Sequence, residues 1–314
     1  MKTTNYTKLF LSLLLLMAFQ FTQAQLAFRN DNSKLVNPNF HSGCAITIID
    51  WNNDGLDDII RLSQGHDCYV EVRTIDQKYT TVHLGDFGTG NSAWAMTVAD
   101  IDHNGYVDVV ADGPNAIGVL MTNNTGTGAT LSWLANSGFF LQNATFGDFN
   151  NDGWIDLFCC DDNDASHIYM NDGAGNLMVS SFINFALNPG ITYGGNNDPA
   201  DSGNYGSVWV DFDNDGDMDL FVAHCRQASS STSDLRRKDR LFVNDGFNNF
   251  TDQSTAYGIE ATSYAQTWTA SFGDIDNDGD LDLMVTNHDI PSQIFENDGT
   301  GHYTDITATT GFDW

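Results

Sequence analysis

Basic residues are scarce in this sequence. Lysine and arginine together number 12, against 42 aspartates and glutamates, and the formal net charge at pH 7 is −30. Nucleic acids and anionic membranes both recruit proteins through basic surfaces. We therefore expect neither of them to be a partner of this protein.

Cysteine is also scarce. The five cysteines do not form the dense, even pattern of a small disulfide-stapled domain, and no CxxC metal-binding spacing occurs among them; they are Cys44, Cys68, Cys159, Cys160 and Cys225. Two interpretations stay open: Cys44 pairs with Cys68 in an oxidising compartment, or all five are buried, unpaired thiols.

Long hydrophobic runs are absent except for one near the N-terminus. The run LFLSLLLLMAFQF follows Lys2 and Lys8 and precedes the small residues Thr22 and Ala24. This arrangement is typical of a secretory signal peptide, with cleavage after Ala24. The run is too short for a comfortable membrane span. We expect residues 1–24 to be the signal peptide and residues 25–314 to be an exported domain, extracellular or at the cell surface, that does not span a membrane.

Recognisable catalytic motifs are missing as well. The sequence contains no GxSxG elbow, no HExxH pair and no glycine-rich phosphate loop. Carboxylate pairs suited to glycoside chemistry cannot be singled out among so many acids. The sequence therefore predicts that the protein is not an enzyme.

An acidic nine-residue segment is present in five copies. The copies are DWNNDGLDD (50–58), DIDHNGYVD (100–108), DFNNDGWID (148–156), DFDNDGDMD (211–219) and DIDNDGDLD (274–282). They share the pattern D-x-[DN]-x-[DN]-G-x-x-D, whose nine residues we number as positions 1 to 9. Recurrence at this spacing indicates a repeat architecture.

Strand-like segments flank every copy. An apolar pair follows each segment, and residues two and four before each first aspartate are mostly apolar, as Ile46 with Ile48 and Ala270 with Phe272 illustrate. This period of two predicts strands with one packed face. Asn-Asp-Gly turns at 171–173, 244–246 and 297–299 predict further hairpins. The fold class predicted is all-β, a β-propeller of four-stranded blades with five calcium-loop repeats.

The spacing of the carboxylates predicts a calcium cage in each loop. Oxygens from positions 1, 3, 5 and 9 converge on one point, glycine at position 6 permits the bend, and the carbonyl at position 7 faces inward. We expect about five Ca²⁺ ions, bound most tightly by the two loops with four aspartates and less tightly by the second loop. The predicted side-chain ligands are Asp50, Asn52, Asp54, Asp58, Asp100, Asp102, Asn104, Asp108, Asp148, Asn150, Asp152, Asp156, Asp211, Asp213, Asp215, Asp219, Asp274, Asp276, Asp278 and Asp282. The predicted carbonyl ligands are those of Leu56, Tyr106, Trp154, Asp217 and Asp280.

These loops and their flanking strands resemble the FG-GAP/VCBS repeats of integrin alpha-like β-propellers. The last two units, with VWVDFDNDGDMDLFVAH and FGDIDNDGDLDLMVTNHD, look similar to repeats of bacterial ASPIC/UnbV-type secreted proteins. The resemblance covers essentially all of residues 25–314 and implies radially packed blades with calcium between the first two strands of each. Such propellers commonly have seven blades. Either five blades close a ring here, or the sequence belongs to a longer protein that continues past Trp314.

A second set of candidate residues recurs at the other end of the same strands. These are the candidate ligand-binding residues. Asp161, His224 and Asn287 lie thirteen residues after the first aspartate of a loop, and Trp94, Tyr205 and Trp268 lie six residues before one. Aromatic and amide side chains suit sugars, whereas the alternative is that they are ordinary loop ends and core aromatics.

These features predict a monomeric, secreted binding or adhesion module for a glycan or an extracellular protein, with structural calcium. One alternative is a structural or anchoring module of a larger exported protein. The other is a polysaccharide lyase or hydrolase, which the scarcity of lysine and arginine disfavours.

Overall fold

The structure is a computed structural model that describes residues 32–36, 45–88, 93–138, 140–162, 165–183, 203–226, 234–259 and 265–311. The predicted signal peptide and Cys44 lie outside these residues. The chain divides into two units, Met1–Lys34 and Leu35–Trp314. The described part of the first unit is a short 3-10 turn, η1 (Asn32–Lys34). No helix among the described residues has the length and apolar character to cross a membrane.

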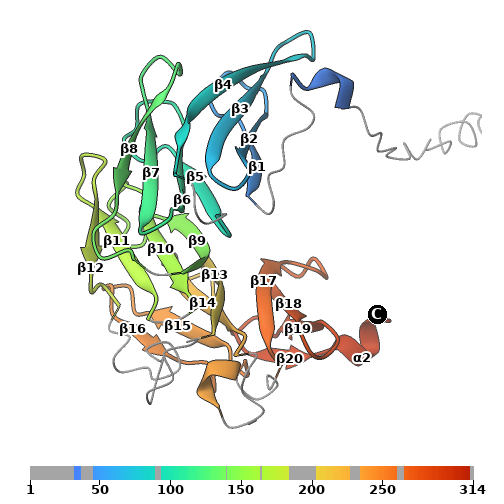
Figure 1. The fold of residues 1–314 in the computed structure, drawn as a ribbon. Helices are drawn as coiled ribbons and strands as arrows, with labels where there is room; N and C mark the ends of the chain where they lie inside the picture. The colour runs from blue at the N-terminus through green and yellow to red at the C-terminus, as the bar shows by residue number, and fades with distance from the viewer. Residues whose placement is uncertain are drawn as a thin grey trace, which may run out of the picture. The chain divides into compact units, whose positions relative to one another are not determined.

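The second unit consists of five four-stranded antiparallel sheets, called blades 1 to 5 here (Figure 1). Blade 1 contains β1 (Ile46–Ile49), β2 (Asp58–Ser63), β3 (Asp67–Arg73) and β4 (Tyr79–Asp86); blade 2 contains β5 (Met96–Ala99), β6 (Asp108–Asp112), β7 (Ile117–Thr122) and β8 (Ala129–Trp133); blade 3 contains β9 (Leu141–Gly147), β10 (Asp156–Asp161), β11 (His167–Asn171) and β12 (Leu177–Ser180); blade 4 contains β13 (Asn204–Val210), β14 (Asp219–His224), β15 (Arg240–Asn244) and β16 (Phe250–Asp252); blade 5 contains β17 (Thr267–Gly273), β18 (Asp282–Asn287), β19 (Gln293–Asn297) and β20 (Tyr303–Asp305). The short helices η3 (Leu235–Arg237) and α2 (Thr307–Thr310) complete the described elements.

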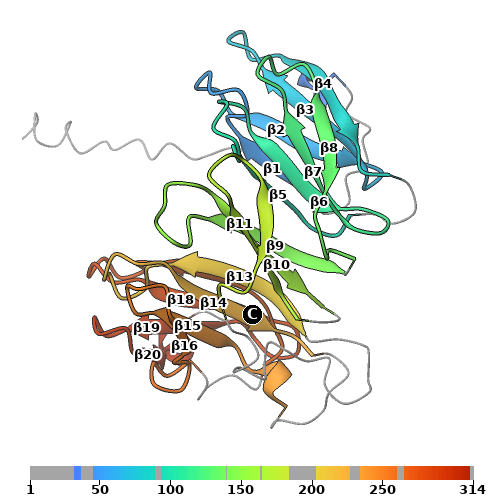
Figure 2. The same ribbon diagram turned by 90° about the vertical axis from the view of Figure 1, so that its left-hand side faces the viewer.

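Each blade is a meander in which neighbours in sequence are neighbours in the sheet. The first strands of successive blades contact one another, from β1 to β5, β9, β13 and β17. Figure 2 labels the first four of them, β1, β5, β9 and β13. Each acidic loop joins the first and second strands of its blade, as the sequence predicts. The predicted all-β architecture of four-stranded blades is thereby confirmed.

The hydrophobic core lies between blades and not within one of them. Four clusters of buried side chains each combine residues of two successive blades. Between blades 3 and 4, Phe149 stacks on Trp209 with ring centroids 3.7 Å apart, and the edge of Phe158 meets the same indole. A blade therefore depends on its neighbours to bury its apolar faces, as expected of a repeat protein.

The predicted packing of the first strands is confirmed in blade 4 and wrong in blade 1. Ser207 and Trp209 are 7% and 8% exposed, because β13 packs against β9 of the preceding blade. The equivalent Ile46 and Ile48 of β1 are 56% and 67% exposed. The described residues before Ile46 contain no strand that could cover them.

The described cysteines are buried thiols. Cys68, one half of the disulfide that the sequence left open, is buried and forms no disulfide in the structure. Cys159 and Cys160 follow one another in β10 and are also buried. They are therefore part of the packing between blades.

Candidate functional site

The five acidic loops share one backbone conformation. The residue at position 4 has a positive φ of 56° to 65° in each loop, and the glycine at position 6 has a φ of 84° to 101°. The position 4 residues are Asn53, His103, Asn151, Asn214 and Asn277. Asparagine tolerates this left-handed conformation better than most residues, and glycine adopts it freely. Sequence reasoning had used the glycine, and it missed the recurrent asparagine at position 4.

The first aspartate of each loop organises the turn. Its two carboxylate oxygens accept the backbone N–H groups of positions 5 and 6, at 2.8 to 3.2 Å in all five loops. The side chain at position 5 accepts the N–H of position 7 at 2.8 to 3.0 Å. These bonds hold three side-chain oxygens of the predicted cage in place without an ion, namely both oxygens of position 1 and one oxygen of position 5.

The aspartate at position 9 has a different environment. It is at most 2% exposed in all five loops; the residues are Asp58, Asp108, Asp156, Asp219 and Asp282. One of its oxygens accepts an N–H from the third strand of the blade or its end, as from Thr122 to Asp108 at 2.7 Å. In four loops the other oxygen accepts the N–H of position 2, as from Ile101 to Asp108 at 2.9 Å. Position 9 therefore ties the loop to the rest of its blade.

Three loops bring carboxylates close enough to hold a metal ion. The ligand atoms of positions 1, 3 and 9 lie within 4.8 Å of one another in each group; the groups are Asp100 with Asp102 and Asp108, Asp211 with Asp213 and Asp219, and Asp274 with Asp276 and Asp282. The first and third loops have the amides Asn52 and Asn150 at position 3. In these three loops the structure brings together the predicted ligands at positions 1, 3 and 9. The inward orientation of the position 7 carbonyls stays a prediction.

The fourth loop has carboxylate oxygens that lack partners. Asp213 Oδ1 and Asp219 Oδ2 are buried, and within the described residues neither has a partner with hydrogen-bond geometry, although the amide of Phe212 lies near Asp219. Burial, followed by the charges of neighbouring carboxylates, raises the pKa of Asp219 to about 8. Burial likewise raises the pKa of Asp108 to about 7 and that of Asp156 to about 6. A bound cation would supply the positive charge that these oxygens lack.

Hairpins between third and fourth strands clamp the loops of the preceding blade. Asn171 Nδ2 donates to the carbonyl of Ile101 in loop 2 at 3.0 Å, and Asn297 Nδ2 lies 3.4 Å from the carbonyl of Phe212 in loop 4. The Oδ1 atoms of both asparagines accept two N–H groups of their own turns. The sequence analysis interpreted the Asn-Asp-Gly motifs only as turns. In two of the three motifs the first asparagine, Asn171 or Asn297, has this second role, whereas Asn244 donates to Met218 of its own blade.

Neighbouring loops also contact one another through positions 4 and 7. The His103 ring of loop 2 stacks on the Trp154 ring of loop 3 with centroids 4.3 Å apart. Asn151 of loop 3 donates to Asp217 of loop 4 at 3.2 Å. Loops 2, 3 and 4 are therefore joined through their side chains.

The six candidate ligand-binding residues lie at the opposite ends of the blades, and two of them are fully buried. Strand pairing places Asn204 opposite His224 and Leu141 opposite Asp161. His224 and Asp161 have no exposed surface. His224 Nδ1 donates to the carbonyl of Lys238, and its Nε2 lies 2.8 Å from the side-chain amide group of Asn204. Burial lowers the pKa of His224 to about 4, so this ring is a neutral part of the packed interior.

The other candidates at this end are more accessible. Trp94 is 53% exposed beside Phe140, and Trp268 is 45% exposed beside His288. Tyr205 and Asn287 are half-buried at the ends of β13 and β18. The two tryptophans belong to different blades, and a ligand role for the accessible four stays a prediction.

Basic side chains gather near these ends in blade 4. Arg236 pairs with Asp234 at 2.8 Å, Arg237 with Asp289 at 2.9 Å and Arg240 with Asp252 at 3.4 Å. Asp289 also accepts the backbone N–H of Gln266 at 3.0 Å. Part of the small basic content of the chain is thus used in internal ion pairs.

Comparison with known structures finds similar folds, and the lectin reported first has a TM-score above 0.5. A lectin from Agrocybe aegerita, described as recognising non-reducing terminal N-acetylglucosamine, superposes with a TM-score of 0.55 at 18% identity, over 83% of this chain and 65% of that chain. A putative 6-phosphogluconolactonase from Bacteroides fragilis gives a TM-score of 0.47 at 17% identity, over 79% and 66%. The V. cholerae biofilm matrix protein Bap1 gives 0.44 at 16% identity, over 85% and 40%. The chain thus spans just under two thirds of the lectin's length.

Sequence comparison identifies the repeat. No curated protein sequence matches the chain significantly. The family model of the FG-GAP-like repeat matches residues 46–111, 148–222 and 211–285, which is more than half of the chain and includes all five acidic loops in full. The strands and loops of these segments are those described above. The chain therefore belongs to the FG-GAP-like repeat family.

Proposed function

We propose that the protein is a calcium-stabilised, exported binding module. The observation that carries this proposal is the repeated loop. Hydrogen bonds hold the position 1 carboxylate in the same way in five successive blades, and in three of these loops the carboxylate oxygens of positions 1, 3 and 9 lie within 4.8 Å of one another. Carboxylate, amide and carbonyl oxygens are the ligands that Ca²⁺ prefers, whereas Zn²⁺ favours histidine and cysteine.

The donor set of the loops fits calcium. The fourth loop supports this fit most directly, because its buried Asp213 Oδ1 has no hydrogen-bond partner within the described residues. Five Ca²⁺ ions would add ten positive charges and change the formal net charge from −30 to about −20. When bound, the ion would cross-link the two strands that each loop connects and would relieve the repulsion between the loop's carboxylates.

The ligand that we propose is a glycan or an extracellular protein. The fold shared with the Agrocybe aegerita lectin agrees with this class of function, although the likeness at 18% identity extends to the fold alone. Exposed tryptophans such as Trp94, Trp133 and Trp268 offer flat apolar faces of the kind that bind sugar rings. We further propose that the module has no catalytic activity, that residues 1–24 direct its export, and that it is a monomer.

The test is a binding screen of the secreted chain with and without calcium. We expect N-terminal sequencing to start at Gln25, and we expect the chain to capture a glycan or a protein without changing it chemically. Binding is expected to weaken when EDTA removes the metal. A cooperative fold that is indifferent to calcium would contradict the metal assignment, and turnover of a captured polysaccharide would contradict the assignment as a non-enzymatic module.

A further inference from the structure

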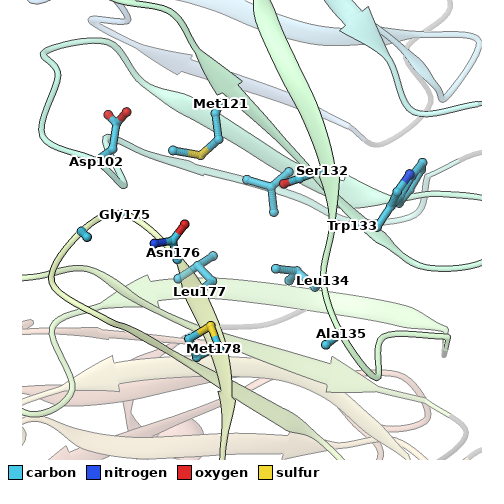
Figure 3. A pocket seen from close by; sticks show the side chains of 12 residues that line it. Asp102, Met121, Ser132, Trp133, Leu134, Ala135, Gly175, Asn176, Leu177 and Met178 are labelled. Carbon is cyan, nitrogen blue, oxygen red and sulfur yellow. The ribbon is translucent and has the colours of Figure 1, made fainter.

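Two hollows adjoin one exposed tryptophan on the flank of blade 2. The larger has a volume of about 450 Å³ and lies between strands β7 and β8 of blade 2 and the β11–β12 hairpin of blade 3 (Figure 3). The smaller, of about 250 Å³, is lined by Pro114, Asn115, Ala116 and Trp133. Trp133, at the end of β8, lines both hollows and is 47% exposed.

Hydrogen bonds hold the walls of the larger hollow. The N–H of Leu134 donates to the carbonyl of Ile117 at 2.9 Å, and the hydroxyl of Tyr169 in blade 3 donates to the carbonyl of Ala135 at 3.1 Å. The latter bond joins the two blades at Ala135, which lines the hollow. On the opposite wall, Asn176 Nδ2 donates to Asp172 Oδ2 at 2.9 Å. A ligand would therefore meet walls that are already in place, which lowers the entropic cost of binding.

The Trp133 ring is held by close packing on a glycine. A Cβ atom added at Gly113 would lie 2.5 Å from the ring, which is too close for any side chain. The indole therefore rests on the backbone of the turn between β6 and β7. The outer edge of the indole, at Cζ3 and Cη2, thus lies close to the protein backbone, while the ring borders both hollows.

The lining of the larger hollow is apolar with a few polar groups. Met121, Leu134, Leu177 and Met178 supply apolar surface, and Ser132 and Asn176 supply the polar groups (Figure 3). Asp102 also lines the hollow, but its carboxylate oxygens accept the backbone N–H and the side-chain amide of Asn104 within loop 2. A few polar groups placed in an apolar surround are typical of small-molecule sites. The apolar C–H faces of sugar rings pack on aromatic rings such as Trp133, and amide and hydroxyl groups bond to the sugar hydroxyls.

The charge of the hollows narrows the class of ligand. Within the described residues, no lysine, arginine or histidine lines either hollow, and Asp102 is the one charged residue of the larger hollow. The net charge of the chain is −30. An anionic polymer would be repelled from this surface, whereas a neutral one would not.

We propose that the two hollows are neighbouring subsites for a neutral polysaccharide chain, which passes over Trp133. This inference rests on the proposed glycan-binding function and locates it on the flank between blades 2 and 3. Two hollows that share one tryptophan favour several consecutive sugar units over a single terminal sugar. The accessible residues at the blade ends, such as Trp268, form the rival location.

The experiment measures binding of the calcium-loaded chain to polysaccharides by affinity electrophoresis and calorimetry. The neutral probes are laminarin and xyloglucan with their defined oligosaccharides, and the acidic probes are alginate and polygalacturonate. The variants are Trp133→Ala, Trp133→Phe and Met178→Asp for the proposed site and Trp268→Ala for the rival location, with Val179→Asp and Phe247→Ala as controls. Val179 neighbours Met178 in β12 and lies outside the lining, and Phe247 is an exposed aromatic in blade 4. Melting temperature confirms that each variant is folded.

We expect a neutral probe to bind and the acidic probes to bind at least tenfold more weakly. Trp133→Ala and Met178→Asp should each weaken binding about tenfold or more, Trp133→Phe should retain part of it, and the controls should retain all of it. Affinity should rise from disaccharide to hexasaccharide. Because Met178 is 57% exposed, Met178→Asp tests the site even if Trp133→Ala fails to fold.

Several outcomes would overturn the inference. If binding persists in Trp133→Ala and disappears in Trp268→Ala, the site lies at the blade ends, and the proposed glycan-binding function stands without this location. A preference for acidic probes, or equal affinity for disaccharide and hexasaccharide, would refute the neutral extended chain. If the folded wild-type chain binds no polysaccharide, the inference and the glycan part of the proposed function fail together, and binding of a protein remains as the proposed function.

Discussion

The two ends of the blades are built in different ways. At the loop end, the same hydrogen bonds from positions 1 and 5 recur in all five blades. At the opposite end each blade has its own arrangement, such as His66 with Asp86 in blade 1 and His224 with Asn204 in blade 4. A feature that recurs in every repeat serves what the repeats have in common, which is their folding. Features that differ between repeats are free to determine what the protein binds.

Removal of calcium should give the largest effect, because it acts on every loop and on none of the opposite ends. At roughly millimolar calcium and the weak affinities of extracellular modules, each proposed site would contribute about 0.4–1.4 kcal/mol, and five would contribute about 2–7 kcal/mol. We expect the melting temperature to fall markedly in EDTA and to recover as about five ions bind. Calorimetry and metal analysis measure both quantities. An unchanged melting temperature would show that bound calcium does not stabilise the fold.

The second largest effect is expected from a position 9 aspartate. Asp156→Ala leaves the buried N–H groups of Phe149 and Asn171 without their acceptor, which should cost about 2–4 kcal/mol even in EDTA. The matched control is Asp152→Ala in the same loop, where the side chain is exposed and the cost should stay below about 1 kcal/mol. Urea unfolding in EDTA measures both. Equal losses would show that the two kinds of aspartate do not differ in structural role.

The opposite end should respond to acid through His224. Burial lowers the pKa of His224 in the folded state to about 4, whereas the unfolded chain has the ordinary value of 6.5. The unfolded state therefore binds the proton more readily, so this stability is present above pH 6.5 and is lost as the pH falls towards 4. The loss should reach about 3 kcal/mol. His224→Gln should unfold with a shallower pH dependence over this window, and identical slopes for the two proteins would contradict the assignment.

Local spacing is the reason that much of the loop end was predictable. All the predicted ligands of a loop and the glycine of its bend lie within nine consecutive residues, so their pattern does not depend on the rest of the chain. The sequence alone therefore identified the loops and the strands beside them. The burial of Asp108 was not predictable in this way. Its partner Thr122 comes from the third strand, and a nine-residue pattern contains no information about that strand.

Contacts between blades explain most of what the sequence did not predict. The clamp from Asn171 to Ile101 spans 70 positions. The exposure of Ile46 and Ile48 likewise depends on whether another strand packs against β1. Their alternation in sequence is the same as that of the buried residues Ser207 and Trp209 in blade 4. At the opposite end, the matched offsets correctly placed His224 and Trp268 at strand ends. They could not distinguish the buried ring from the exposed one.

The smallest effect should come from a change of one charge in one loop. Loops 3 and 4 share the same hydrogen bonds from position 1 and differ at position 3, which is Asn150 in one and Asp213 in the other. If a fourth carboxylate strengthens calcium binding, Asn150→Asp should raise the affinity of loop 3 about tenfold, and Asp213→Asn should lower that of loop 4 by a similar factor. Titrations of the two single variants, followed by calorimetry, measure these shifts. In EDTA the two changes should shift stability slightly in the opposite sense, because burial and the charges of Asp215 and Asp211 raise the pKa of Asp213, so Asp213→Asn relieves repulsion and Asn150→Asp adds it. A change in stability without a change in affinity would mean that position 3 acts on the fold and not on the ion.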